Sequence, residues 1–201
     1  GSRIVLYDDS AIRSSARAWF MLRMFGASNV AILDGGLAKW RAEGRELESG
    51  RRTLRHRHFT VWRDPAQTRD KDAVLANIET GREQLIDARA VPRFTGEAAD
   101  PRPGIASGHI PGSRNLVYTD LYNAEGTFRS KAEIRALFEA AGIDLARPVI
   151  TSCNSGVTAC VLAFALHLVG KNDVALYDGS WTEWGGDPML PKATGKAAAV
   201  A

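Results

Sequence analysis

The sequence places one cysteine where a protein backbone can make a thiol reactive. Cys153 ends an apolar, β-branched run, Pro148–Ser152, of the kind that forms a buried strand. An unbroken helical pattern follows over Val161–Val169. A cysteine between a strand and a helix faces loop N–H groups and the positive end of the helix dipole, which together stabilise a thiolate. We therefore expect Cys153 to be a nucleophile, with an inert cysteine at a buried strand end as the alternative.

The residues between that cysteine and the helix favour a tight loop around one sulfur atom. They are small or flexible enough for their N–H groups to converge as a nest of donors. In order they are Asn154, Ser155, Gly156, Val157 and Thr158. The second cysteine, Cys160, falls on the apolar face of the following helix. We expect a small core residue there, with a resolving thiol as the alternative.

Composition describes an ordinary soluble globular chain. It has 201 residues, of which 45% are hydrophobic and 24% charged, and no apolar run has membrane-spanning length. The opening residues show no secretory pattern. Two cysteines seven residues apart and four scattered histidines suggest neither a disulfide framework nor a zinc site. We expect a reducing, cytoplasmic setting, no membrane contact and no cofactor.

The charge pattern contains one dense basic run, Arg51–His58, within a net charge of +3. A nucleic-acid patch and a solvated linker are the two interpretations. The run has a single aromatic neighbour, Phe59, and no nucleic-acid motif accompanies it, so a linker is favoured and no nucleic-acid partner is expected. A mild basic balance also suits a small anionic substrate.

A segment at the start of the chain is repeated near its end. Shifted by 144 residues without a gap, residues 3–41 match a later stretch at glycines, turns and core positions. The matched pairs include Phe20 with Phe164, Gly26 with Gly170, Asp34-Gly35 with Asp178-Gly179, and Trp40 with Trp184. In this alignment Asp9 stands where the second copy has Cys153. A carboxylate cannot do thiol chemistry, so only the second copy is expected to be active.

The residues between the two copies alternate helical and strand patterns. We expect a helix over Asp70–Thr80, a buried strand over Gln84–Arg89 and a capped helix over Lys131–Ala141. Short β-branched runs alternating with helices favour an α/β domain with a parallel sheet, whose reactive groups lie at the carboxyl ends of strands. The long stretch Ala90–Ser107 is expected to be a loop, and loops of that length are usually functional.

Four motifs together resemble the rhodanese family of sulfurtransferases. They are Asp87-Ala88-Arg89, Gly108-His109-Ile110-Pro111-Gly112-Ser113, the Cys153–Thr158 loop, and Tyr177-Asp178-Gly179-Ser180-Trp181. The resemblance implies a rhodanese-like parallel sheet flanked by helices. It implies a complete catalytic domain at residues 66–190 and the C-terminal half of a second, inactive copy at residues 1–41. Residues 42–65 would then be a linker and residues 191–201 a tail.

The loop resembles that of the 3-mercaptopyruvate enzymes of this family. Cys-Asn-Ser-Gly-Val-Thr carries no charge, whereas thiosulfate enzymes have basic residues in the loop; Asn154 replaces the usual glycine. The resemblance assigns substrate binding to Arg93 and Arg102, and to loop residues Asn154, Gly156, Val157 and Thr158. A guanidinium can bind a carboxylate through two parallel hydrogen bonds.

The resemblance also implies a mechanism. Cys153 would take sulfur from 3-mercaptopyruvate, release pyruvate and pass the sulfur to thioredoxin, another thiol or cyanide. Ser155 would hydrogen-bond the substrate or relay a proton. His109, Asp87 and Arg89 are expected to be structural.

Two rival classes of protein share this fold, a phosphatase and a non-catalytic binding module. A phosphatase needs an arginine after a five-residue loop, but position 159 is alanine and the loop carries no basic residue, which argues strongly against this class. A thiosulfate:cyanide sulfurtransferase and a non-catalytic rhodanese-like binding module stay open.

The first copy lacks the elements that precede the Cys153 strand in the second. We expect this to leave Val5, Trp19 and Leu22 uncovered, and the missing half-domain to be supplied by a separate polypeptide.

Overall fold

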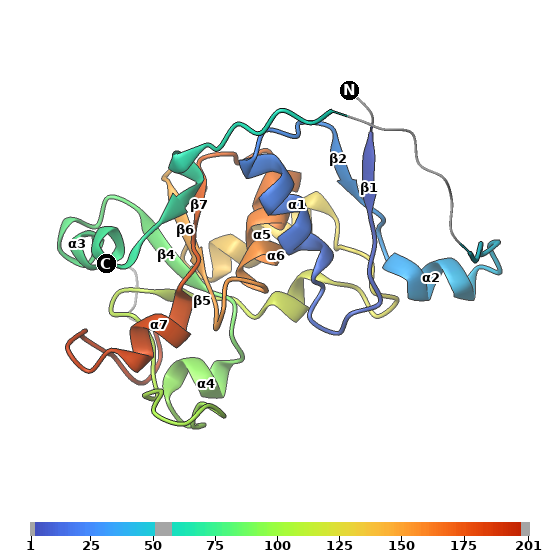
Figure 1. Cartoon of the computed structure of the whole chain (residues 1–201). Coiled ribbons are helices and arrows are strands. Elements are labelled where there is room, and N and C mark those ends of the chain that lie inside the picture. Colours follow the sequence, from blue (N-terminus) through green and yellow to red (C-terminus); the bar gives the residue numbers. More distant parts are fainter. Residues whose placement is uncertain (1–2, 51–57, 198–201) are drawn as a thin grey trace.

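The computed structural model describes residues 3–50 and 58–197, and its elements are shown in Figure 1. The first part of the chain forms β1 (Ile4–Leu6), α1 (Ser15–Met24), β2 (Val30–Ile32) and α2 (Gly36–Ala42). The middle forms η1 (Pro65–Gln67), β3 (Thr68–Arg69), α3 (Lys71–Thr80), β4 (Gln84–Asp87), α4 (Val91–Thr95), β5 (Arg114–Asn115), η2 (Tyr118–Leu121) and α5 (Lys131–Ala140). The last part forms β6 (Val149–Ser152), α6 (Ala159–Leu168), β7 (Val174–Tyr177) and α7 (Ser180–Gly186).

The larger sheet has five parallel strands in the order β3-β7-β6-β4-β5. Strand β6 lies at its centre, and all four residues of β6 are buried. Strands covered on both faces are continuously apolar or β-branched, which explains the run that ends before Cys153. The expected α/β fold with a parallel sheet flanked by helices is therefore confirmed.

Helix α6 lies between this sheet and α1, so it is apolar on all sides. Its first eight residues are all buried. Trp19 of α1 packs edge-on against Phe164 of α6, with ring centroids 4.9 Å apart. Trp19 is only 5% exposed, which contradicts the expectation that its side chain is uncovered; Val5 is 54% exposed, as expected. Figure 1 shows the resulting order of layers: the five-stranded sheet, α6, α1 and the separate parallel pair β1–β2.

The two copies of the repeat form the same elements. Helices α1 and α6 begin 144 residues apart, at Ser15 and Ala159, and so do α2 and α7. The strands correct the gapless alignment, however. Val30 of β2 pairs with Ile4, and the shift of 144 residues would make Pro148 the equivalent partner of Val174. In the structure, Val174 of β7 pairs with the next residue, Val149.

The first copy therefore has one more residue between its strand and its helix than the second. The residue that corresponds to Cys153 is Asp8, not Asp9. The same conclusion follows from the next helix: the N–H of Leu37 donates to Asp8 O at 3.0 Å, and the N–H of Trp181 donates to Cys153 O at 3.0 Å.

Two segments differ from the sequence-based expectation. The stretch expected as a loop contains the short helix α4, which has Pro92 in its first turn and ends at Gly96 with φ +86°. Its five residues are too few to show a helical period. Within residues 191–197 of the expected tail, Ala193 exchanges backbone hydrogen bonds with His109 at 2.8 and 2.9 Å, which attaches this part to the sheet domain.

The N-terminal copy is hydrogen-bonded to the last residues of the expected linker. The N–H groups of Trp62 and Asp64 donate to the carbonyl groups of Phe25 and Met24 at the end of α1, at 3.0 and 2.9 Å. Most of the basic run, residues 51–57, lies outside the described residues.

Candidate active site

Cys153 follows directly on the carboxyl end of the central strand β6. Its residue is 1% exposed, and its thiol is free. The loop over residues 153–158 then leads into α6, as the strand-loop-helix pattern predicts. Cys153 therefore lies at the carboxyl edge of the parallel sheet, and the loop after it leads to the N-terminus of α6.

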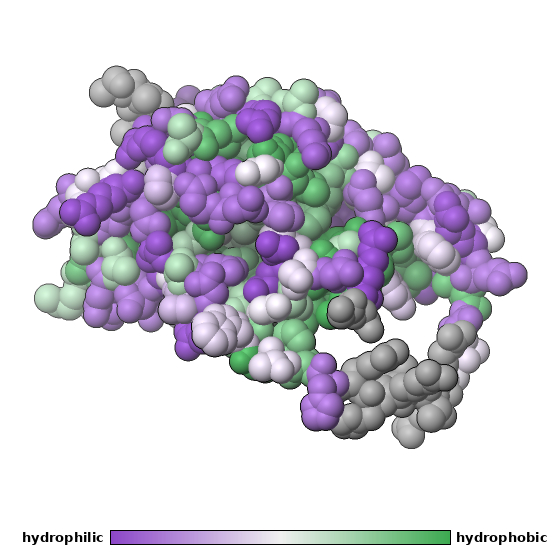
Figure 2. Space-filling model, turned by 90° about the horizontal axis from the view of Figure 1, so that it is seen from above, coloured by the Kyte–Doolittle hydropathy of each residue, from purple (hydrophilic) through white to green (hydrophobic). Residues whose placement is uncertain are grey.

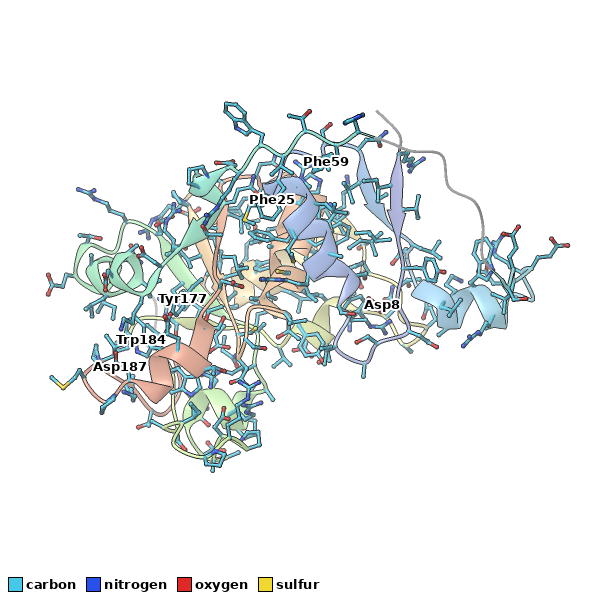
Figure 3. All side chains as sticks on the ribbon, viewed as in Figure 1. Asp8, Phe25, Phe59, Tyr177, Trp184 and Asp187 are labelled. Atoms are coloured by element: carbon cyan, nitrogen blue, oxygen red, sulfur yellow. The ribbon has the colours of Figure 1, made fainter. Side chains whose placement is uncertain are left out.

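The first residues of helix α7 form hydrogen bonds with the start of this loop. The N–H of Cys153 donates to Ser180 Oγ at 3.2 Å. The N–H groups of Trp181 and Thr182 donate to the carbonyl groups of Cys153 and Asn154, both at 3.0 Å. Ser180 adopts φ +52°, a left-handed conformation that non-glycine residues seldom take, and its hydroxyl donates to Tyr177 O at 2.8 Å. Figure 3 shows Tyr177 and Trp184 close together beside the start of α7, and their rings pack edge-on with centroids 6.2 Å apart.

The expected loop residues differ in exposure. Ser155 is exposed, whereas Asn154, Val157 and Thr158 are half-buried and Gly156 is buried. The Asn154 Oδ1 atom is buried, and within residues 3–50 and 58–197 it has no hydrogen-bond partner. Val157 and Thr158 accept from the first N–H groups of α6, those of Cys160 and Val161. The chain thus presents Ser155 and the edge of Asn154 beside Cys153.

Cys160 behaves as the small core residue that the sequence predicts. It is fully buried, and its Sγ donates to Gly156 O at 3.1 Å. Burial raises the pKa of the Cys160 thiol to about 12. A thiol that stays protonated in this way is a poor nucleophile, which leaves Cys153 as the candidate nucleophile of the site.

The two expected substrate-binding arginines share one carboxylate. Arg93 Nη2 pairs with Asp100 Oδ2 at 2.5 Å, and the Asp100 side chain is only 2% exposed. Asp100 Oδ1 accepts the backbone N–H of Arg102 at 3.0 Å. Arg102 Nη1 donates to Thr182 Oγ1, which in turn donates to Asn154 O at 2.5 Å. The structure therefore connects Arg102 to the Cys153 loop through Thr182, and Arg93 to Arg102 through Asp100.

The residues expected to be structural have structural contacts. Arg89 forms a buried pair with Asp87 at 2.7 Å, donates to Gly108 O at 2.8 Å and lies over the ring of Trp181. The His109 ring stacks on Phe94 at 3.8 Å, and its Nδ1 lies 2.8 Å from Phe94 O. Burial lowers the pKa of His109, so the ring is neutral at neutral pH.

Four contacting residues were not expected from the sequence: Ser180, Thr182, Asp178 and Arg17. Asp178 and Ser180 belong to the Tyr177–Trp181 motif, which was the signal that could have indicated them, and Thr182 follows this motif in the first turn of α7. Arg17 comes from the first copy, and no local pattern marks it.

The described part of the chain contains no group of three or more His, Cys, Asp or Glu side chains able to hold a metal ion. Nor does any helix within residues 3–50 and 58–197 have the length and apolar character required to cross a membrane.

Comparison with known families identifies the class of protein. The rhodanese-like domain model matches residues 1–43 and 70–187. This chain therefore belongs to the rhodanese family, which the four motifs had indicated.

The relatives within that family are sulfurtransferases. Human 3-mercaptopyruvate sulfurtransferase is 42% identical over 185 residues, which are 91% of this chain and 62% of the relative. The 3-mercaptopyruvate sulfurtransferase of Escherichia coli K12 is 42% identical over 189 residues, which are 94% of this chain and 66% of the relative. Bovine thiosulfate sulfurtransferase is 39% identical over 186 residues, covering 91% of this chain and 63% of the relative. The chain thus spans a little under two thirds of these relatives.

A solved structure supports the same assignment. The crystal structure of SseA from Escherichia coli, described as a 3-mercaptopyruvate sulfotransferase with the rhodanese fold, superposes with a TM-score of 0.78 at 38% identity. The superposition covers 90% of this chain and 67% of SseA.

Proposed function

We propose that this chain carries the sulfur-transferring site of a 3-mercaptopyruvate sulfurtransferase. The observation that carries the proposal is the Cys153 loop: one thiol at the carboxyl end of the central strand, in a loop without charge, with Arg102 connected to it through Thr182. The names of the human and Escherichia coli relatives support the same substrate.

In the proposed first step, the Cys153 thiolate attacks the sulfur atom of 3-mercaptopyruvate. The new S–S bond forms as the C–S bond breaks, and its electron pair leaves on carbon as the enolate of pyruvate, which takes up a proton. Arg93 and Arg102, which are connected to the loop through Asp100 and Thr182, bind the carboxylate and carbonyl of the substrate. Asn154, Gly156, Val157 and Thr158 line the sulfur atom through the loop backbone, and Ser155 relays the proton.

In the second step, a thiolate of the acceptor attacks the outer sulfur atom of the persulfide. The Cys153 thiolate is the leaving group, so the site returns to its starting state. We propose thioredoxin or a small thiol as the acceptor, and cyanide serves as an acceptor in the test tube. Both cysteines of the chain are free thiols, which supports a reducing, cytoplasmic setting as part of this proposal.

Pyruvate release tests the function directly. The chain, incubated with 3-mercaptopyruvate and dithiothreitol, is expected to release pyruvate with a kcat/KM above its value for thiosulfate with cyanide. A larger kcat/KM for thiosulfate would favour the second candidate, which the bovine relative supports. No turnover of either substrate, from a chain that is folded, would favour a binding module.

We also propose that the N-terminal copy is half of a domain completed by another polypeptide segment. Its α1 residues Met21 and Leu22 correspond to Ala165 and Leu166 of α6. Ala165 and Leu166 are completely buried, whereas Met21 is 40% exposed. Met21 and Leu22 line an apolar groove with Ala18, Phe25, Phe59 and Val61. Figure 3 shows Phe25 and Phe59 beside each other at the end of α1, and Figure 2 shows apolar surface among the polar residues of the molecule seen from above.

The strands indicate what that segment supplies. Strand β6 pairs with β4 on one side and β7 on the other, whereas within the described residues β1 pairs with β2 alone. We propose that the partner adds a strand parallel to β1 and a helix equivalent to α5. On this proposal residues 1–41 belong to the half-domain, residues 42–65 link it to the catalytic domain at 66–190, and residues 191–201 form a tail.

Dye binding tests this arrangement. The chain alone is expected to bind a hydrophobic dye such as ANS, and Met21→Glu is expected to reduce the signal. A chain that is monomeric, unfolds cooperatively and binds no dye would contradict the proposal.

A further inference from the structure

Besides its contacts with α6 and α7, the Cys153 loop is contacted by a side chain from the first copy of the repeat. Arg17 lies on α1, yet its Nη1 is 2.5 Å from Asp178 Oδ1 and 3.4 Å from the carbonyl oxygen of Gly156. Asp178 follows β7 and precedes the turn that opens α7. The Arg17 guanidinium therefore connects the Cys153 loop, at Gly156, to the turn before α7, at Asp178.

Gly156 is the point at which the loop bends. Its φ is +74°, and a Cβ at this position would collide with Asp178 Oδ1 and lie 3.1 Å from Arg17 Nη1. The loop backbone is thus packed directly against the ion pair. The Gly156 carbonyl accepts from Cys160 Sγ as well as from Arg17, so its orientation is fixed from α6 and from α1.

The ion pair also sets the charge next to Gly156, three residues after Cys153. The Asp178 side chain is 56% exposed and that of Arg17 only 26%. Without Arg17, the Asp178 carboxylate would stand alone against the loop and oppose a second negative charge there. Within the described residues, the titratable or charged groups around the loop come from three helices and one arginine: Arg17 from α1, Cys160 from α6, Asp178 and Glu183 around α7, and Arg102 through Thr182. Glu183 accepts a hydrogen bond from the Tyr177 hydroxyl at 2.7 Å.

We propose that Arg17 is a positioning residue for the sulfur transfer: its bridge between Asp178 and the Gly156 carbonyl fixes the bend of the loop and favours the thiolate and persulfide of Cys153. This inference rests on the proposed function for its substrate, but not for its chemistry at the thiol. It gives the N-terminal copy a role in the reaction although that copy has no thiol of its own.

The test measures the rate of Cys153 alkylation by iodoacetamide as a function of pH, with the labelled cysteine located by mass spectrometry. In Arg17→Gln, the pH at which the alkylation rate is half-maximal (the midpoint) is expected to rise, because Asp178 is left without its cation. The alkylation rate at neutral pH is expected to fall about 3–10-fold. In Asp178→Asn the midpoint is expected to fall, because Arg17 is left unopposed. Arg17→Lys should restore part of the wild-type behaviour.

Arg23→Gln is the matched control, since Arg23 lies on the same helix but stacks over Trp19 and donates to Ser28 O. Its midpoint is expected to equal that of the wild type. Equal midpoints for Arg17→Gln and Arg23→Gln, or shifts of Arg17→Gln and Asp178→Asn in the same direction, would overturn the proposal. If Arg17→Gln does not fold, Arg17→Lys and Asp178→Asn still decide it.

The same experiment separates this inference from the proposed function. If the wild-type chain releases no pyruvate from 3-mercaptopyruvate while the two midpoints shift in opposite directions, the substrate is wrong and the role of Arg17 stands.

Discussion

The two copies of the repeat place different side chains at the same point of the fold. Asp8 follows β1 as Cys153 follows β6, and the carbonyl of each accepts an N–H from the helix after the next strand. Figure 3 places Asp8 at the end of β1, well apart from Tyr177 and Trp184 beside α7. The same strand-loop-helix unit is therefore built once around a carboxylate and once around a thiol.

The carboxylate of Asp8 binds the N–H groups of its own loop. Asp8 Oδ1 accepts from Ser10 at 3.1 Å, and Asp8 Oδ2 accepts from Ser15 at the start of α1 at 2.5 Å. The first loop therefore contains its own anion, held where a helix N-terminus favours negative charge. The second loop is one residue shorter and holds a thiol, whose negative charge exists only as a thiolate or persulfide.

The surroundings of the two loops differ as well. Thr182, which connects Arg102 to the Cys153 loop, corresponds to Ala38 in the first copy. Asp9 instead pairs with Arg41 at 3.1 Å, and both side chains are about half exposed. The comparison shows that the strand-to-helix turn of the first copy accommodates a carboxylate, and that the thiol and the connected arginine make the turn of the second copy a candidate for catalysis.

The largest predicted effect comes from exchanging the two side chains. Cys153→Ser is expected to lower turnover by a factor on the order of 10³ or more, because the nucleophile is gone. Adding Asp8→Cys to this variant should not restore turnover, since the first loop has neither Thr182 nor Arg102 beside it. Pyruvate release measures both. Activity recovered in the double variant would show that the two loops are equivalent.

The next effect concerns the arginine connected to the loop. Arg102→Ala is expected to lower kcat/KM for 3-mercaptopyruvate by about 1.5–3 kcal/mol of transition-state binding, the range for a charged hydrogen bond. Arg93→Ala should lower it similarly and also reduce the thermal midpoint, because the buried Asp100 carboxylate loses its partner. Arg82→Ala is the control, being exposed before β4 at the opposite edge of the sheet. Equal kcat/KM values for Arg82→Ala and Arg102→Ala would refute the role of Arg102.

A smaller effect is expected from the carboxylate of the first loop. Asp8→Ala removes the acceptor for the first N–H of α1 and should lower the free energy of unfolding by about 0.5–2 kcal/mol, the range for helix caps. Cys153 alkylation should keep its wild-type rate. Urea unfolding gives the first quantity; an unchanged stability would mean that Asp8 does not hold its loop.

The smallest effect on turnover is predicted for the buried thiol. Cys160→Ala should keep most activity and change the alkaline stability. The pKa of Cys160 is raised from 9.0 to about 12 by burial, so between these values the unfolded chain has lost a proton that the folded chain keeps. Stability therefore falls as pH rises, by up to about 1.4 kcal/mol per pH unit for this group. Unfolding of Cys160→Ala from pH 8 to pH 11 should show a smaller loss than the wild type; identical curves would contradict it.

Local patterns were enough for the elements that position Cys153. A buried strand, a loop of small residues and an apolar helix are adjacent in the chain, and the capping box at Ser130 and Glu133 formed as expected. Contacts between distant segments left no such pattern. The bridge from Arg17 to Gly156 spans 139 residues.

The same limit explains the misplaced equivalence of Asp9. A gapless shift matches both helices and the strand and turn between them, but it cannot detect one extra residue in the loop before α1. Strand register and hydrogen bonds locate that residue, and they do so only in three dimensions.

The central claim is that Cys153 carries the transferred sulfur. After incubation with 3-mercaptopyruvate without an acceptor, intact mass is expected to increase by one sulfur atom per chain, the increase to map to the peptide containing Cys153, and dithiothreitol to remove it. An added sulfur that maps to Cys160, or a chain that releases pyruvate while Cys153 never gains sulfur, would contradict the account.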